Sequence, residues 1–124
     1  MRGLTTAQAD DIRKALHTAE IRSGLRFGLF LGEPAGGPVG GRRHFAERLH
    51  AALGPEAPDA VVVLVDVKGR GLEIVTGENA RHRLTDAACR LTAMSMATAF
   101  SVGDLIGGVL YGINALGEQA TARR

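Results

Sequence analysis

The fold of this chain is set by the stretch Asp59–Gly77, "DAVVVLVDVKGRGLEIVTG". Its first half is an apolar run rich in β-branched residues, which is typical of a strand buried on both faces. The "KGRG" that follows can turn the chain tightly, so the sequence predicts a β-hairpin that pairs Ala60–Val67 with Leu72–Thr76. We therefore expect Ala60–Val67 to be the central strand of the sheet.

The segment before this hairpin predicts one more strand, placed between two helices. A capping-box pattern in "TTAQ" opens a helix of about residues 6–22. Alternating apolar residues in "LRFGLFLG" predict a strand that is packed mainly on one face. In "RRHFAERLHAAL" the apolar side chains of Phe45, Leu49 and Leu53 share one helical face, which predicts the second helix.

The last third of the chain predicts two helices. We expect Ser101 to be the N-cap of the second one, with Asp104 in its first turn. The window Leu91–Leu116 is apolar enough to resemble a membrane span, but the break at residues 101–104 and its acid favour two buried helices. Four glycines between residues 103 and 112 indicate close packing of this helix on the sheet.

The order of these elements predicts an α/β fold, a single-domain α/β/α sandwich in which helices flank a small mixed sheet. A chain of 124 residues fits one hydrophobic core better than two. We therefore expect one domain over residues 1–124. Residues 32–41, "GEPAGGPVGG", should form a flexible loop, and residues 118–124 a C-terminal tail.

Composition excludes several classes of function. Aromatic residues make up only 4% of the chain, and the Lys and Arg residues are spread along it, so we expect no nucleic-acid partner. The single cysteine, Cys89, rules out an intrachain disulfide and favours a buried apolar role. Acids occupy the N-terminal region where a signal peptide would need an apolar core, which favours a cytoplasmic location.

Charged residues near the predicted loops form no recognised motif. Arg42 and Arg43 follow the glycine-rich loop, but the prolines in that loop remove backbone donors that a phosphate cradle would need. Asp66, followed by Lys68, is most simply the end of a strand. Acids at helix starts are favoured by capping and by the helix dipole alone. These residues by themselves therefore predict no reaction.

Two motifs carry a family resemblance. They are Leu84-Thr85-Asp86 and the pattern Phe100-x-x-Gly103-Asp104-x-x-Gly107-Gly108, which lie downstream of "VVVLVDV" and "LEIVTG". With these motifs the chain resembles the TPM domain over roughly Leu4–Leu116, and more closely an actinobacterial branch of uncharacterised proteins related to it. The resemblance implies an α/β/α sandwich.

The resemblance also implies an acidic site. One plant thylakoid member of the TPM family is described as an acid phosphatase, some members bind calcium, and others act as accessory factors for membrane proteins. Carried over to this chain, Asp86 and Asp104 would hold Ca²⁺ or Mg²⁺, and Glu33 would replace the aspartate that usually follows the first strand. The family's glutamate five positions before Asp86 is Arg81 here.

Because Arg81 is followed by His82 and Arg83, the basic segment 81–83 would repel a cation and attract an anion. Our leading hypothesis is a non-enzymatic accessory module for a protein partner, which could itself be membrane-associated. It would make contact through segment 81–83 and the three acids. The alternative is a weak metal-assisted phosphatase, in which Asp86 and Asp104 hold the metal and an arginine binds the phosphate. A third hypothesis is an anion-binding or small-ligand module.

Overall fold

The computed structural model describes residues 4–34 and 41–123. The segment 35–40, which makes up most of the predicted flexible loop, lies outside the described residues. In chain order the elements are α1 (Thr6–Ser23), β1 (Arg26–Gly32), α2 (Gly41–Ala51), η1 (Gly54–Asp59), β2 (Ala60–Asp66), β3 (Gly71–Thr76), η2 (Ala80–His82), α3 (Asp86–Ser101) and α4 (Leu105–Ala122).

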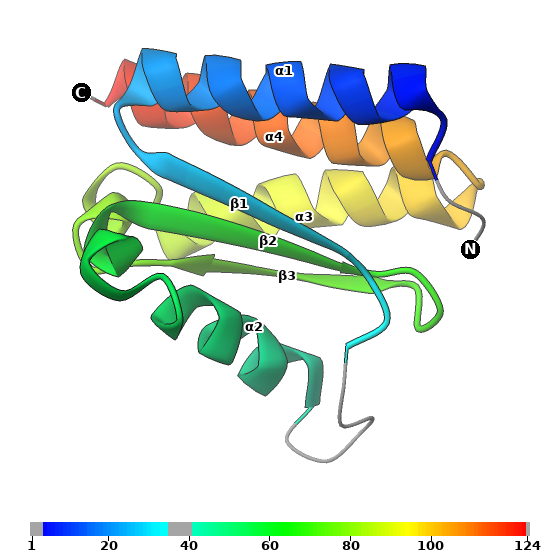
Figure 1. The fold of residues 1–124 in the computed structure, drawn as a ribbon, viewed down its shortest axis with the longest axis horizontal. Helices are drawn as coiled ribbons and strands as arrows, with labels where there is room; N and C mark the ends of the chain where they lie inside the picture. The colour runs from blue at the N-terminus through cyan, green and yellow to red at the C-terminus, as the bar shows by residue number, and fades with distance from the viewer. Residues whose placement is uncertain (1–3, 35–40, 124) are drawn as a thin grey trace.

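Three strands form one mixed sheet in the order β1-β2-β3. β1 runs parallel to β2, and β2 runs antiparallel to β3. Helix α2 covers one face of the sheet, and α1, α3 and α4 cover the other (Figure 1). The predicted α/β fold with a small mixed sheet and flanking helices is therefore confirmed.

β2 is the central strand, as the sequence predicts. Val61, Val63 and Val65 belong to the core beneath the three helices, whereas Leu64 packs with the α2 side. The hairpin prediction is also correct, because β2 pairs with β3 in a register that places Val61 opposite Thr76. Burial of both faces of β2 explains why this strand has no polar residue before its last position, Asp66.

The first helix and strand follow their local sequence signals closely. The capping box of α1 is present, and the helix ends at Gly24, whose φ of 79° is left-handed. β1 differs from the prediction in one respect, because it packs on both faces. Its odd-numbered apolar residues face the three-helix core, and Phe30 meets the ring of Phe45 in α2 edge to face at 5.2 Å.

The junction between the last two helices differs from the prediction. α3 continues through Ser101, and Asp104 is the N-cap of α4, where its side chain accepts the N–H of Gly107 at 2.9 Å. Gly103 turns the chain with a φ of 84°, so Ser101 still belongs to the preceding helix. α4 also extends to Ala122, so residues 118–122 of the predicted tail are helical.

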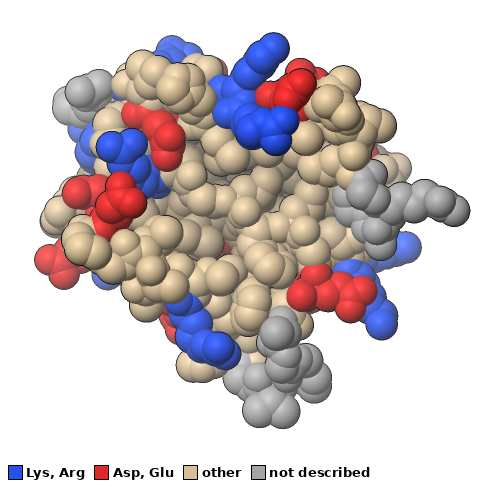
Figure 2. Space-filling model, viewed as in Figure 1, with Lys and Arg blue, Asp and Glu red and all other residues tan. Residues whose placement is uncertain are grey.

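The glycines of α4 bring helices together, and the predicted contact with the sheet is not the one observed. A Cβ at Gly117 would lie 2.9 Å from the Cβ of Ala19 in α1, and one at Gly112 would lie 2.3 Å from the sulfur of Met96 in α3. Within the described ranges, no helix combines the length and apolarity that crossing a membrane requires. On the side where β1 is nearest the viewer, Figure 2 shows charged side chains mainly around the rim of an uncharged surface.

Candidate functional site

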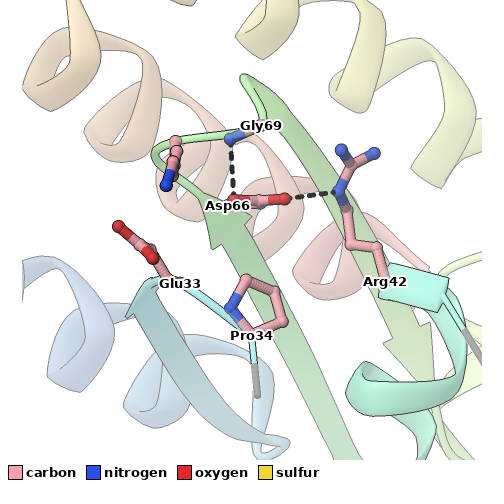
Figure 3. Close-up of a pocket in the computed structure, with 6 residues that line it drawn as sticks. Glu33, Pro34, Arg42, Asp66 and Gly69 are labelled. Atoms are coloured by element: carbon pink, nitrogen blue, oxygen red, sulfur yellow. Dashed lines mark hydrogen bonds and ion pairs between the residues drawn. The ribbon is translucent and has the colours of Figure 1, made fainter. Parts of the chain in front are cut away.

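A hollow of about 310 Å³ lies where β1 and β2 end and α2 begins. We call it the strand-end pocket. In Figure 3, Glu33 comes from the end of β1, Asp66 from the end of β2 and Arg42 from the first turn of α2. The carboxyl ends of neighbouring parallel strands are a common place for binding sites in α/β folds. The described residues that line this pocket are Glu33, Pro34, Arg42, Asp66, Lys68 and Gly69.

Asp66 is the most constrained side chain of the strand-end pocket, with only 15% of it exposed. Its Oδ1 accepts the N–H of Gly69 at 2.9 Å, which closes the turn after β2. Its Oδ2 accepts a hydrogen bond from Nε of Arg42 at 3.3 Å. The carboxylate is therefore held between the turn and the start of α2, and part of its charge is neutralised.

Two glycines make room for this ion pair. A Cβ at Gly69 would lie 2.3 Å from Oδ2 of Asp66, and one at Gly71 would lie 2.3 Å from the guanidinium carbon of Arg42. The "KGRG" segment therefore does more than turn the chain, because larger side chains would displace the pair. Between the two glycines, Arg70 has a φ of 55°, a conformation that is uncommon for a residue with a side chain.

The free charges of the strand-end pocket are balanced. Glu33 and Lys68 are both exposed, whereas Asp66 and Arg42 are paired with each other. A bare metal ion would meet two cationic side chains here, and a phosphate would meet two carboxylates. The lining therefore suits a group that presents both signs of charge, such as a polar protein segment.

The acids predicted from the family resemblance do not share one site. Asp86 begins α3 and Asp104 follows its end, and this helix of 16 residues is about 24 Å long. Asp86 and Asp104 therefore cannot bind the same ion, and only Glu33 lines the strand-end pocket. Across the residues that the structure describes, no three His, Cys, Asp or Glu side chains gather in a way that suits a metal.

In the basic segment 81–83, Arg83 is partly buried and links two helices, whereas Arg81 and His82 are exposed. Arg83 donates from Nε to the carbonyl of Ala120 at 3.1 Å and from Nη2 to the carbonyl of Ser23. It thereby joins the C-terminal turns of α4 and α1, whose carbonyls lack helical donors. Arg81 donates to the carbonyl of Thr76 at 3.0 Å, and His82 is exposed. Arg83 is thus committed to the fold.

Cys89 lies beside a second hollow, which Asp86 and Arg43 also line. The pKa of the Cys89 thiol is raised to about 11, chiefly by burial and in smaller part by the negative charge of Asp86, while the positive charge of Arg43 acts in the opposite direction. A thiol with this pKa is almost entirely protonated at neutral pH and is a poor nucleophile. This agrees with the prediction that Cys89 is a small apolar residue.

Sequence reasoning missed the pair of Arg42 and Asp66. A usable signal was present, because an acid at the end of a fully buried strand is followed by glycines at positions 69 and 71. The partner was not visible, because Arg42 comes from a different element 24 positions earlier.

The fold is shared with solution structures of three bacterial proteins. The BA42 protein of the psychrophilic bacterium Bizionia argentinensis has a TM-score of 0.80 and 18% identity, with 97% of this chain and 83% of that chain covered. The N-terminal domain of the cg2496 protein of Corynebacterium glutamicum has a TM-score of 0.76 and 14% identity, with 94% of this chain and 74% of that chain covered. The N-terminal domain of a P. gingivalis protein has a TM-score of 0.77 and 18% identity, with 94% of this chain and 75% of that chain covered.

At these identities the similarity establishes the fold and leaves the activity open. No match was found among curated proteins. The model of a family described as a domain of unknown function, DUF5130, matches residues 4–117. This match spans nearly all of α1 to α4, and the chain therefore belongs to the DUF5130 family.

Proposed function

We propose that this protein is a non-enzymatic binding module, related to TPM domains, that holds a charged segment of a protein partner in the strand-end pocket. The observation that carries the proposal is the arrangement of four charges. Asp66 and Arg42 neutralise each other at 3.3 Å, while Glu33 and Lys68 remain exposed beside them. A protein segment with neighbouring acidic and basic side chains could pair with both exposed residues.

The phosphatase hypothesis has less support. It requires Asp86 and Asp104 to hold one metal ion, but the length of α3 separates them. It also requires Arg81 or Arg83 to bind phosphate, and Arg83 already donates to two backbone carbonyls. The proposed contact surface is therefore the strand-end pocket, and of the surface predicted from the sequence, segment 81–83 with Glu33, Asp86 and Asp104, it keeps Glu33 alone.

The two lysines of the chain allow a cross-linking test with an internal control, because one of them lies in the strand-end pocket and the other lies outside it. Lys68 lines the strand-end pocket and Lys14 lies on the exposed face of α1. An amine-reactive cross-linker added to the protein in an extract of its host should join partner peptides to Lys68 much more than to Lys14. Peptide mapping by mass spectrometry measures both adducts in the same sample.

Two matched variants separate a specific site from general charge. Glu33→Gln should reduce the Lys68 adduct several-fold, because it removes the second free charge of the pocket. Asp11→Asn, the same change at an exposed position of α1, should leave the adduct unchanged. Equal labelling of Lys14 and Lys68, or a Lys68 adduct that is indifferent to Glu33→Gln, would contradict the proposal.

A metal titration tests the alternative directly. Under the binding proposal, Ca²⁺ and Mg²⁺ should produce no saturable NMR shift at Asp86, Asp104 or Glu33. A saturable shift at one of these acids, together with hydrolysis of a generic phosphate ester that Asp104→Asn abolishes, would favour the phosphatase instead.

A further inference from the structure

The free edges of the two outer strands, β1 and β3, differ in which of their backbone groups have hydrogen-bond partners. At the β3 edge, Nη1 of Arg43 donates to the carbonyl of Ile74 at 2.9 Å. Arg81 donates to the carbonyl of Thr76 two residues further along the same strand. Two carbonyls of the β3 edge are therefore occupied by arginine side chains, which is one way to prevent a further strand from pairing there.

At the β1 edge, the described residues provide a hydrogen-bond partner for the first outward-facing N–H, that of Phe27, and for no later one. The N–H of Phe27 donates to Oε2 of Glu20 at 3.0 Å, so it points away from β2. The carbonyl of Gly32 accepts the N–H of Val67 and points toward β2. Because these directions alternate along a strand, the N–H and C=O groups of Leu29 and Leu31 point away from β2.

These four backbone groups have no hydrogen-bond partner within residues 4–34 and 41–123. In Figure 1 no helix passes in front of β1. Residues 28–32 are partly exposed and carry no charge, and Figure 2 shows an uncharged surface on this side of the molecule. An uncharged edge strand with open donors and acceptors is a template for another strand.

We propose that β1 pairs antiparallel with β1 of a second copy of this chain, about a two-fold axis at Phe30. In this register Leu29 lies opposite Leu31 of the other copy, and each such pair exchanges two hydrogen bonds. The four open groups of one copy are then satisfied by the same four groups of the other. The product is a continuous sheet of six strands, three from each copy.

A second copy fits this edge for reasons of chemistry and shape. The pairing leaves the contact between Glu20 and Phe27 intact, and that contact stops the ladder from extending along the whole strand. Phe30 meets its own symmetry mate, and Gly28 lies opposite Gly32, which leaves room for both rings. The contact brings uncharged surfaces together, as the centre of an interface requires, and its short length makes the dimer a weak one.

The test measures two quantities on the full chain, its mass in solution and the hydrogen exchange of the amides at the β1 edge. Sedimentation equilibrium from roughly 10 µM to 1 mM, the range suited to a weak interface, should show the mass rising from 13.0 kDa toward twice that value. Over the same range, hydrogen exchange at the amides of Leu29 and Leu31 should slow by about tenfold or more. The amide of Phe27, which is already bonded to Glu20, should change little.

Variants at Gly28 tie the association to this edge. A Cβ at Gly28 would lie 3.8 Å from Val62, which is ordinary contact, so side chains fit there. Gly28→Lys should weaken association by about tenfold or more because it buries an unpaired charge, whereas Gly28→Ala should change it by less than about twofold. Leu31→Pro, which removes one outward N–H, gives a second way to break the pairing.

Two results would overturn the proposal. One is a chain that stays at its monomer mass at the highest concentration, with unprotected amides at Leu29 and Leu31. The other is a dimer that persists in both Gly28→Lys and Leu31→Pro, since its interface would then lie on a different face.

Discussion

The two ends of the sheet are both rich in arginine but use it in opposite ways. At one end, Arg83 donates to carbonyls of Ser23 and Ala120 and is taken up by the fold. At the other end, Arg42 pairs with Asp66 beside a hollow that also exposes other charges. The cluster "RHR" at residues 81–83, which the sequence suggests as a contact site, is thus mainly structural. The pocket is built from residues that are scattered along the chain.

The two ends differ in the hydrogen-bond acceptors that they present to an arginine side chain. Helix C-termini present carbonyls that have no donor within the helix, and the helix dipole adds negative potential there. Two such termini, those of α1 and α4, meet beside Arg83. At the strand ends Arg42 pairs with one carboxylate, that of Asp66, and the exposed charges of Glu33 and Lys68 lie in the same hollow.

The largest expected effect comes from removing the structural arginine. Arg83→Met keeps an apolar stem but removes both donations, and we expect the free energy of unfolding to fall by about 2–4 kcal/mol. Urea unfolding followed by circular dichroism measures it. His82→Ala, at the exposed neighbour, should change stability by less than about 0.5 kcal/mol. Equal losses of unfolding free energy in the two variants would contradict a structural role that belongs to Arg83 and not to its exposed neighbour.

The next effect tests whether glycine makes room for the pair at the pocket end. Gly71→Ala would place a Cβ 2.3 Å from the Arg42 guanidinium, which can move away only by giving up its pair with Asp66, so we expect a loss of about 1.5 kcal/mol. In the Arg42→Ala background the same substitution should cost much less, because the obstructing group is gone. Equal costs in the two backgrounds, measured by urea unfolding, would show that Gly71 is required for another reason.

A smaller loss is expected from the pair itself. Asp66→Asn keeps the shape of the side chain but removes its charge, and we expect a loss of about 1–1.5 kcal/mol because the pair is only partly buried. A double-mutant cycle with Arg42→Met isolates the interaction energy. Glu33→Gln serves as the control for a free charge of the same pocket and should be nearly neutral. A coupling energy near zero would mean that Asp66 acts only through the turn.

The smallest effect at neutral pH concerns the thiol near Asp86. The folded-state pKa of Cys89, about 11, is raised from its ordinary value of 9.0. The stability that this shift contributes is present below pH 9 and is lost as the pH rises from about 9 to 11, because the unfolded thiol ionises first. Cys89→Ala should remove this part of the alkaline loss, as measured by denaturant midpoints. Identical alkaline profiles for both proteins would contradict it.

Local patterns were sufficient for most of the elements. The apolar β-branched run predicted the central strand, and the capping box predicted the start of α1. These signals depend on neighbours within one or two turns of chain, so they can be read in one dimension. The start of α4 was misplaced because Ser101 and Asp104 both have capping side chains, and only the left-handed Gly103 between them settles which one acts.

The contacts within the candidate site could not be predicted from local sequence patterns. The sequence alone determined that acids and arginines lie near loop ends, and it correctly predicted the sheet that positions them. Only the tertiary structure decided which charges meet, because Arg42 lies 24 positions from Asp66, and Arg83 lies 60 positions from Ser23. Contacts at such separations depend on how the helices cross the sheet, and side-chain periodicity along one element carries no information about that crossing.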